Sequence, residues 1–321
     1  MTTAHASYRA DIVVPCYNEE EVLGHTIPVI RDYFAGLVAD PDNRLASFRI
    51  LLVDDGSKDT TWTVIEGLAA AAPEIEGLKL ARNFGHQSAM LAGLSHADAD
   101  VILTMDCDLQ DDITAIARMI AAYEGGSHLA LGVRNDRSSD TLGKSGTANS
   151  YYRLLSLMGI DIIENHADFR LMSRAALAAL LQYREVNLFL RGLIPQLGFP
   201  VTLVPYARQP RTLGETKYTM RKMLGLAMDG ITSFSVMPLR LISLLGAILF
   251  AITSVLGCVF VYLVLTHSRS LVPGWASTAL PVLFLGGVQL LSLGVLGEYV
   301  GKIYLETKQR PRFIVETRTG E

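Results

Sequence analysis

Five short apolar segments alternate with helical patterns between residues 11 and 134 of the chain. The apolar segments lie at residues 11–15, 49–53, 78–82, 101–105 and 129–134. Strands that alternate with helices in this way form βα units, and such units build a mostly parallel sheet with right-handed crossovers. The sequence therefore predicts a doubly wound α/β domain. A further apolar segment at residues 201–205 is expected to add a strand at the edge of the sheet.

Polar side chains follow the strand that each of these segments predicts. The carboxyl ends of parallel strands meet at one edge of a sheet, and ligands of open α/β sheets bind at that edge. We therefore expect one site that contains the residues at those ends, namely Tyr17, Asn18, Asp54, Asp55, Arg82, Asp106, Asp108 and Arg134.

The acidic run after the fourth segment suggests a metal ion. Asp106 and Asp108 are two residues apart, so in an extended segment they project to the same side. Gln110 continues the spacing with a neutral oxygen. Carboxylates together with substrate phosphates are the usual ligands of Mg²⁺. The alternative is an acidic turn that caps the helix beginning near Asp112.

Two later polar regions carry further candidates. Residues 165–171 form a polar cluster that leads to Ser173 as a helix cap, and within it Asp168 and Arg170 are able to pair. His166 is expected to be a loop or supporting histidine. A basic run then follows, which is either a solvated face or a clamp for phosphates and anionic headgroups; it contains Arg208, Arg211, Lys217, Arg221 and Lys222.

The C-terminal third predicts membrane segments. Residues 219–239 mix apolar and charged residues at helical spacing, as an interfacial amphipathic helix does. Residues 241–266 and 276–297 contain no charge, and each is long enough to cross a bilayer, which takes about 20 residues. The connector contains one basic residue, Arg269, whereas the tail is rich in them, so both ends of this hairpin are expected in the cytoplasm.

These patterns predict four regions: an α/β domain with the candidate site at residues 1–218, a juxtamembrane segment at 219–239, two transmembrane helices within 240–300, and a basic cytoplasmic tail at 301–321. The formal net charge of −4 does not favour nucleic-acid binding. Cys16, Cys107 and Cys258 lack the spacing of metal ligands, and we expect reduced thiols. We expect no signal peptide in residues 1–10.

Seven motifs together resemble the inverting family 2 glycosyltransferases of the GT-A fold. They are DIVVPCYNE (11–19), DDGS (54–57), RNFG (82–85), MDCDLQD (105–111), ADFRLMSR (167–174), GETKY (214–218) and GEYVGKIY (297–304). More narrowly, they resemble the polyprenyl-phosphate glycosyltransferases, which include bactoprenol glucosyltransferases and dolichol-phosphate mannose synthases. Two positions depart from the family pattern: Ala167, where many members have glycine, and Cys107, where alanine or valine is commoner.

The resemblance implies roles for individual residues. A nucleotide-sugar site would contain Pro15, Tyr17, Asn18, Glu19, Asp54, Asp55, Arg82, Asp106 and Arg134. Mg²⁺ or Mn²⁺ would be held by Asp106, Asp108 and Gln110. Asp168 would act as a base or position the acceptor, and the catalytic set would also include Asp108, Arg211 and Lys217.

The implied reaction transfers a hexose, with glucose from UDP-glucose preferred, to undecaprenyl phosphate with inversion, giving a lipid-linked sugar donor for cell-surface glycosylation. GDP-mannose, UDP-linked amino sugars, a processive polysaccharide synthase and a non-catalytic membrane scaffold are the alternatives. The expected location is the inner membrane as a multi-pass protein with a cytoplasmic catalytic domain. Relatives suggest a homo-tetramer, and a flippase or second glycosyltransferase is the expected downstream partner.

Overall fold

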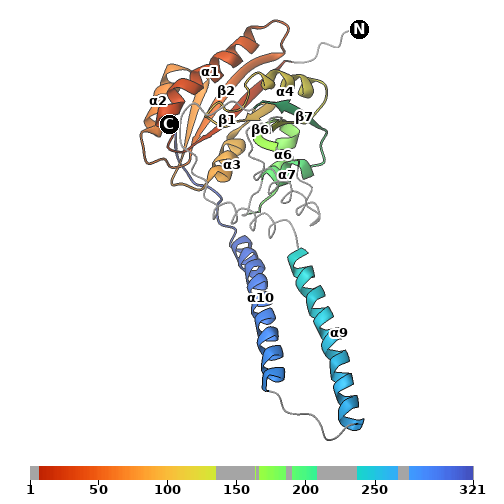
Figure 1. The fold of residues 1–321 in the computed structure, drawn as a ribbon. Helices are drawn as coiled ribbons and strands as arrows, with labels where there is room; N and C mark the ends of the chain where they lie inside the picture. The colour runs from red at the N-terminus through yellow and green to blue at the C-terminus, as the bar shows by residue number, and fades with distance from the viewer. Residues whose placement is uncertain are drawn as a thin grey trace. The chain divides into compact units, whose positions relative to one another are not determined.

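The computed structural model describes residues 7–134, 163, 166–185, 190–207, 237–266 and 275–320. They divide into an α/β unit, to which residues 310–320 belong, and a unit of two long helices (Figure 1). Residues 135–162 lie outside the described ranges, and so does the basic run with Arg208, Arg211, Lys217, Arg221 and Lys222. So does most of the predicted amphipathic segment.

One sheet of eight strands forms the α/β unit, in the order β7-β5-β6-β4-β1-β2-β3-β8. Four pairs of neighbouring strands are parallel: β1–β2, β1–β4, β2–β3 and β5–β7. The pairs that include β6 or β8 are antiparallel. The strands are β1 (Tyr8–Cys16), β2 (Leu45–Asp54), β3 (Ile75–Leu80), β4 (Val101–Thr104), β5 (Leu129–Arg134), β6 (His166–Ser173), β7 (Val201–Tyr206) and β8 (Val315–Arg318).

Helices cover both faces of this sheet. Alternate residues of a strand point to opposite faces, and Ile12 and Val14 of β1 belong to the core that α1 and α4 complete. Val13 points the other way, towards α3, where a Cβ on Gly93 would lie 2.3 Å from its Cγ1. The helices of this unit are α1 (Glu20–Ala39), α2 (Thr61–Ala71), α3 (His86–His96), α4 (Ala115–Glu124), α6 (Arg174–Leu180) and α7 (Leu190–Gln196).

The predicted doubly wound, mostly parallel α/β fold is therefore confirmed, as is the edge strand near residue 201. Residues 165–171 are a correction, because a polar connecting segment was expected there and strand β6 is found in the interior of the sheet. All eight residues of β6 are buried. Ala167, Phe169 and Leu171 face the main core, and the alternate polar residues are buried on the opposite face of the sheet.

The C-terminal tail also contributes to the sheet, which the sequence did not indicate. β8 pairs antiparallel with β3, with Leu78 opposite Arg318. The neighbouring residues extend the attachment, because Ala81 N donates to Ile314 O at 2.9 Å and Arg312 Nη2 donates to Tyr183 O at 2.9 Å. The end of the chain is thus part of the α/β unit.

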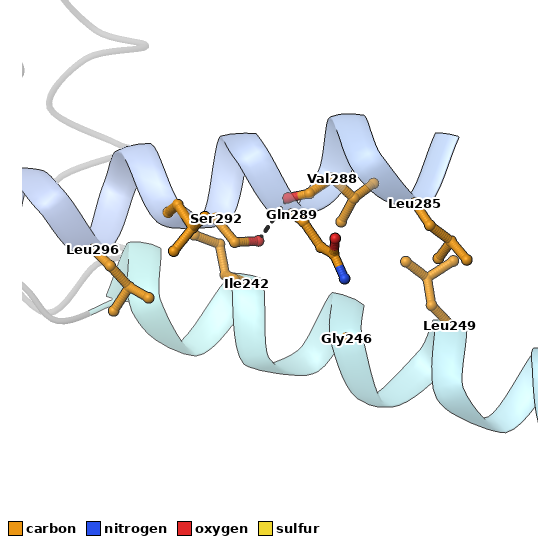
Figure 2. A pocket seen from close by; sticks show the side chains of 9 residues that line it. Ile242, Gly246, Leu249, Leu285, Val288, Gln289, Ser292 and Leu296 are labelled. Atoms are coloured by element: carbon orange, nitrogen blue, oxygen red, sulfur yellow. Dashed lines mark hydrogen bonds between the residues drawn. The ribbon is translucent and has the colours of Figure 1, made fainter. Parts of the chain in front are cut away.

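The second unit contains α9 (Met237–Thr266) and α10 (Trp275–Thr307). In the described part of the chain one helical stretch, Phe284–Thr307, is long and apolar enough to cross a membrane, and Leu239–Leu249 is a shorter apolar stretch. A largely apolar pocket of about 690 Å³ lies between α9 and α10, and Gln289 points into it opposite Gly246 (Figure 2). The two-span transmembrane hairpin itself stays a prediction.

A glycine joins two of the turns at the carboxyl edge of the sheet. Gly56 follows β2 with a φ of 63°, in the left-handed region that favours glycine. A Cβ there would lie 2.3 Å from the carbonyl carbon of Arg82. The turn after β2 and the turn after β3 therefore pack backbone against backbone.

We expect Gly56→Ala to destabilise the α/β unit by about 2 kcal/mol or more, since the left-handed backbone and the contact with Arg82 both resist a side chain. Thermal unfolding of the purified full chain measures this. Gly67→Ala is the matched control, because Gly67 lies inside α2, a Cβ there would meet no neighbouring atom within 4 Å, and alanine favours a helix. Equal unfolding midpoints for the two variants would contradict this account of the turn.

Candidate active site at the carboxyl edge of the sheet

The predicted site residues gather at the carboxyl ends of β1, β2, β3, β4 and β5. β6 runs antiparallel to β4, with Arg170 opposite Thr104, so the first residues of β6 reach the same edge. The hydroxyl of Thr104 donates to the carbonyl oxygen of Asp168 at 2.6 Å and fixes the register there. Asp168 is thereby placed beside the acidic run that follows β4.

Hydrogen bonds in both directions connect the turn after β1 with the turn after β2. Asn18 N donates to Ser57 Oγ at 2.9 Å, and Lys58 N donates to Asn18 Oδ1 at 2.9 Å. Glu19 N donates to Thr61 Oγ1 at 2.9 Å. Tyr17 is exposed at the edge. These contacts give the predicted nucleotide-binding turn a fixed backbone.

Asp54 and Asp55 are buried and support the backbone of neighbouring turns. Asp54 Oδ1 accepts from Ser57 N at 3.0 Å, and Asp55 accepts from the backbone of Phe84 at 2.7 Å and of Gly85 at 2.9 Å. Burial raises the pKa of both carboxyls despite these donors. Their predicted contact with a nucleotide stays a prediction, since the geometry describes a supporting role.

Two other predicted nucleotide-binding residues differ in exposure. Pro15 is buried within β1. Arg82 is exposed, with its guanidinium carbon 3.9 Å from the centre of the Phe84 ring. Arg82 is thus the more accessible of the two to a ligand at this edge.

The acidic run after β4 brings carboxylates together at the site. The side chain of Asp106 is 39% exposed, and Asp108 Oδ1 accepts from Gln110 N at 3.2 Å. Gln110 itself is buried. Burial raises the pKa of Asp106. His86 lowers it, but the carboxylates Asp111, Asp168 and Asp108 raise it, and the net shift is upward.

A hard divalent cation fits the chemistry of this acidic pair, because oxygen ligands and an excess of negative charge are what such an ion requires. In the described ranges no group of three or more His, Cys, Asp or Glu side chains is arranged to hold a metal. Metal binding by Asp106, Asp108 and Gln110 therefore stays a prediction.

Asp168 is surrounded by positively charged groups. Its Oδ2 lies 2.7 Å from Arg191 Nη2 and 3.4 Å from His86 Nε2, and its Oδ1 pairs with Arg170 and accepts from Arg191 Nε at 3.3 Å. Burial opposes ionisation, but Arg170, His86 and Arg191 hold the pKa of Asp168 well below its usual range. Asp168 is an ionised carboxylate that accepts protons poorly.

The pKa values of two histidines near Asp168 are shifted in opposite directions. Burial lowers the pKa of His86, yet its contacts with Asp168 and Asp106 outweigh that effect and the net shift is upward. His86 Nε2 is also 3.7 Å from Asp106 Oδ1, so it connects the acidic run to Asp168. Burial, assisted by Arg170, lowers the pKa of His166 to about 3, which keeps that imidazole neutral.

Arg134 at the end of β5 is held by two residues from other elements. Its Nε donates to the Tyr206 hydroxyl at 3.1 Å, and its Nη2 lies 3.6 Å from Asp111 Oδ1. Tyr206 in turn donates to Asp111. This network ties the end of β7 and the acidic run to the predicted phosphate-binding arginine.

Sequence reasoning missed His86, Arg191, Tyr206 and the full part played by Asp111 and Arg170. His86 follows a strand-end turn directly and could have been found by that position. Arg191 lies on α7, away from any strand end, and no local signal marks it. Arg211 and Lys217 lie outside the described residues, so their catalytic roles stay predictions.

Replacing Asp168 or Asp106 by asparagine should have different effects on the stability of the chain. Asp168→Asn should destabilise the chain by about 3 kcal/mol, because it leaves the buried Arg170 without its counter-charge. Asp106→Asn should leave stability unchanged or raise it at neutral pH, since a carboxyl whose pKa is raised on folding opposes folding when ionised. Thermal unfolding with a chelator present measures both.

A native-like midpoint for Asp168→Asn would show that Arg170 finds other partners. A large loss of stability for Asp106→Asn would show that its ionised form supports the fold, contrary to its surroundings.

Comparison with known proteins places this arrangement in a family. The model of "Glycosyl transferase family 2" matches residues 11–181. An uncharacterised glycosyltransferase, YkoT of Bacillus subtilis, is 45% identical over 95% of this chain and 90% of its own length. The bactoprenol glucosyl transferase of Shigella phage SfX is 37% identical over 97% of this chain and 99% of its own.

Solved structures similar to this chain are more distant. Staphylococcus aureus TarS residues 1–349 in complex with UDP-GlcNAc align with a TM-score of 0.44 and 16% identity, over 68% of this chain and 64% of that one. Glucosyl-3-phosphoglycerate synthase of Mycobacterium tuberculosis aligns with a TM-score of 0.42 and 15% identity, over 69% of this chain and 76% of that one. The family model and the near full-length relatives decide the assignment: the chain belongs to glycosyl transferase family 2.

Proposed function

We propose that this glycosyltransferase moves a hexose, with glucose from UDP-glucose as the preferred donor, to a polyprenyl phosphate such as undecaprenyl phosphate. The observation that carries the proposal is the 37% identity, over 97% of the chain, to a protein named bactoprenol glucosyl transferase. The alignment covers the C-terminal helices as well as the α/β unit. The similarity is therefore not limited to a catalytic domain of a type that occurs with many different donors and acceptors.

The proposed chemistry is a displacement at C1 with inversion. An oxygen of the acceptor phosphate forms the new bond to C1, and the nucleoside diphosphate leaves with the electrons of the bond that breaks. A phosphate monoester has a second pKa near about 6, so the nucleophile is already largely ionised at neutral pH. A strong base is unnecessary, which agrees with a role for Asp168 in positioning charged groups.

Neutralising the charge on the leaving diphosphate is a greater requirement for catalysis than supplying a base. Asp106 and Asp108 would hold Mg²⁺ or Mn²⁺, which would supply positive charge to the diphosphate when bound. Arg134, fixed by Tyr206 and Asp111, is a further cation at the same edge. Preorganised charges of this kind lower the barrier without reorganising during the reaction.

A membrane location follows from the lipid acceptor and from the topology. The stretch Phe284–Thr307 is suited to crossing a membrane, and β8, which follows it, pairs with β3, which precedes both long helices in sequence. Paired strands share one compartment, so the chain between them must cross the membrane an even number of times. If α10 crosses, a second crossing is needed, and α9 is the described helix best suited to supply it, which supports the two-span hairpin.

The transfer assay combines the purified chain, a short polyprenyl phosphate and a panel of UDP-glucose, UDP-linked amino sugars and GDP-mannose. We expect UDP-glucose to be used best and the transfer to need Mg²⁺ or Mn²⁺. Asp108→Ala should abolish metal-dependent transfer, and Asp106→Ala should lower it less. Anomeric analysis of the product measures the inversion.

Full activity of Asp108→Ala in excess chelator would exclude the metal site. Preference for another donor would change the sugar assignment only. Absence of transfer from every donor, with the chain folded, would overturn the proposed function.

Topology is tested by cysteine labelling in a background without Cys16, Cys107 and Cys258. Arg310→Cys should react with an impermeant maleimide only after intact cells are permeabilised, because residue 310 belongs to the α/β unit. Ser268→Cys, in the predicted external connector, should react in intact cells. Labelling of Arg310→Cys from outside would place the tail on the other side and refute the proposed orientation.

A further inference from the structure

Arg191 is the exposed guanidinium in the charged group around Asp168, in which the His86 side chain is also partly exposed. Its side chain is 43% exposed, whereas that of Asp168 is 4% exposed and that of Arg170 is 1% exposed. Arg191 Nη2 and Nε contact the two oxygens of Asp168 at 2.7 and 3.3 Å, so the carboxylate orients the guanidinium in two directions. A ligand that approaches from solvent reaches Arg191 before it reaches Asp168.

Asp168 contacts two guanidinium groups from different sides. Arg170 pairs with the carboxylate from the buried side, and Arg191 contacts it from the exposed side. The guanidinium of Arg191 is therefore oriented by Asp168 and accessible to solvent. A guanidinium in that position suits an anionic ligand, because its geometry matches the oxygen atoms of a phosphate.

Inversion requires two separate anion sites, because the nucleophile and the leaving group occupy opposite sides of C1. Asp106 and Asp108, with the cation that they are proposed to hold, would serve one of them, the donor diphosphate. Arg191 contacts Asp168 rather than the acidic run, and His86 lies between the two, 3.7 Å from Asp106 and 3.4 Å from Asp168. Arg191 is therefore placed to serve the second anion.

We propose that Arg191 binds the phosphate of the acceptor lipid, held in place by Asp168. This inference rests on the proposed function and names the residue that recognises one of its substrates. Asp168 then acts as a positioning residue, and its low proton affinity is required for that role. The ligand class is a phosphate monoester on an apolar chain, and a matching alcohol without the phosphate should not be bound.

The first measurement is binding of farnesyl phosphate to the full-length protein by calorimetry, without donor, with farnesol as the uncharged comparison. Arg191→Gln should weaken binding of the phosphate about 10- to 100-fold, as the loss of hydrogen bonds to a charged group does. Arg191→Lys should weaken it less. Arg118→Gln is the matched control, because Arg118 is exposed on α4, on the opposite face of the sheet.

The second measurement separates the substrates by steady-state kinetics on the same variants. Arg191→Gln should raise the KM for the acceptor by a similar factor and leave the KM for the donor within about twofold. Donor hydrolysis without acceptor should continue. Thermal unfolding shows whether Arg191→Gln is folded. If it is not, the binding and kinetic measurements on Arg191→Lys, which keeps the charge, test the inference.

A rise in donor KM with acceptor KM unchanged, or wild-type binding of farnesyl phosphate by a folded Arg191→Gln, would overturn the inference alone. Wild-type protein that neither binds farnesyl phosphate nor transfers any sugar to it would overturn the proposed function as well. If binding of farnesyl phosphate depends on Arg191 but the protein transfers a sugar other than glucose, the inference is supported and only the donor assignment changes.

Discussion

The ion pair between Asp168 and Arg170 is the constraint on which the active edge of the sheet depends. Both residues are buried on β6, where an unpaired charge is costly, and each supplies a counter-charge to the other. Arg191 on α7 and His86 on α3 also contact Asp168. One carboxylate thus connects a strand to two helices.

The edge has two layers with different tasks. Asp54 and Asp55 form an inner layer whose oxygens accept from backbone amides of neighbouring turns. Tyr17, Arg82 and Asp106 form an outer layer that solvent reaches. Because the inner layer fixes the turns, the outer side chains are presented without a large ordering cost when a ligand binds.

Much of the fold could be predicted from the sequence, since each parallel strand is an apolar run followed by a polar turn. β6 was missed because its polar residues suggested a connection, and their burial depends on partners such as Arg191 that are distant in sequence. The position of Asp106 at the carboxyl edge follows from the sequence pattern, whereas Asp168 enters the predicted site only through the family resemblance. The cations that surround Asp168 were not anticipated, because a guanidinium on α7 has no signature that local spacing reveals.

The attachment of β8 to β3 has a consequence for the order of synthesis. Until residues 315–318 leave the ribosome, β3 is an open sheet edge with unpaired backbone groups, and such edges invite association with other chains. The strand that covers it is made only after both long helices. The α/β unit therefore cannot be completed before both long helices have been synthesised, and a chain truncated within its last residues would carry a finished site on a sheet that remains open to aggregation.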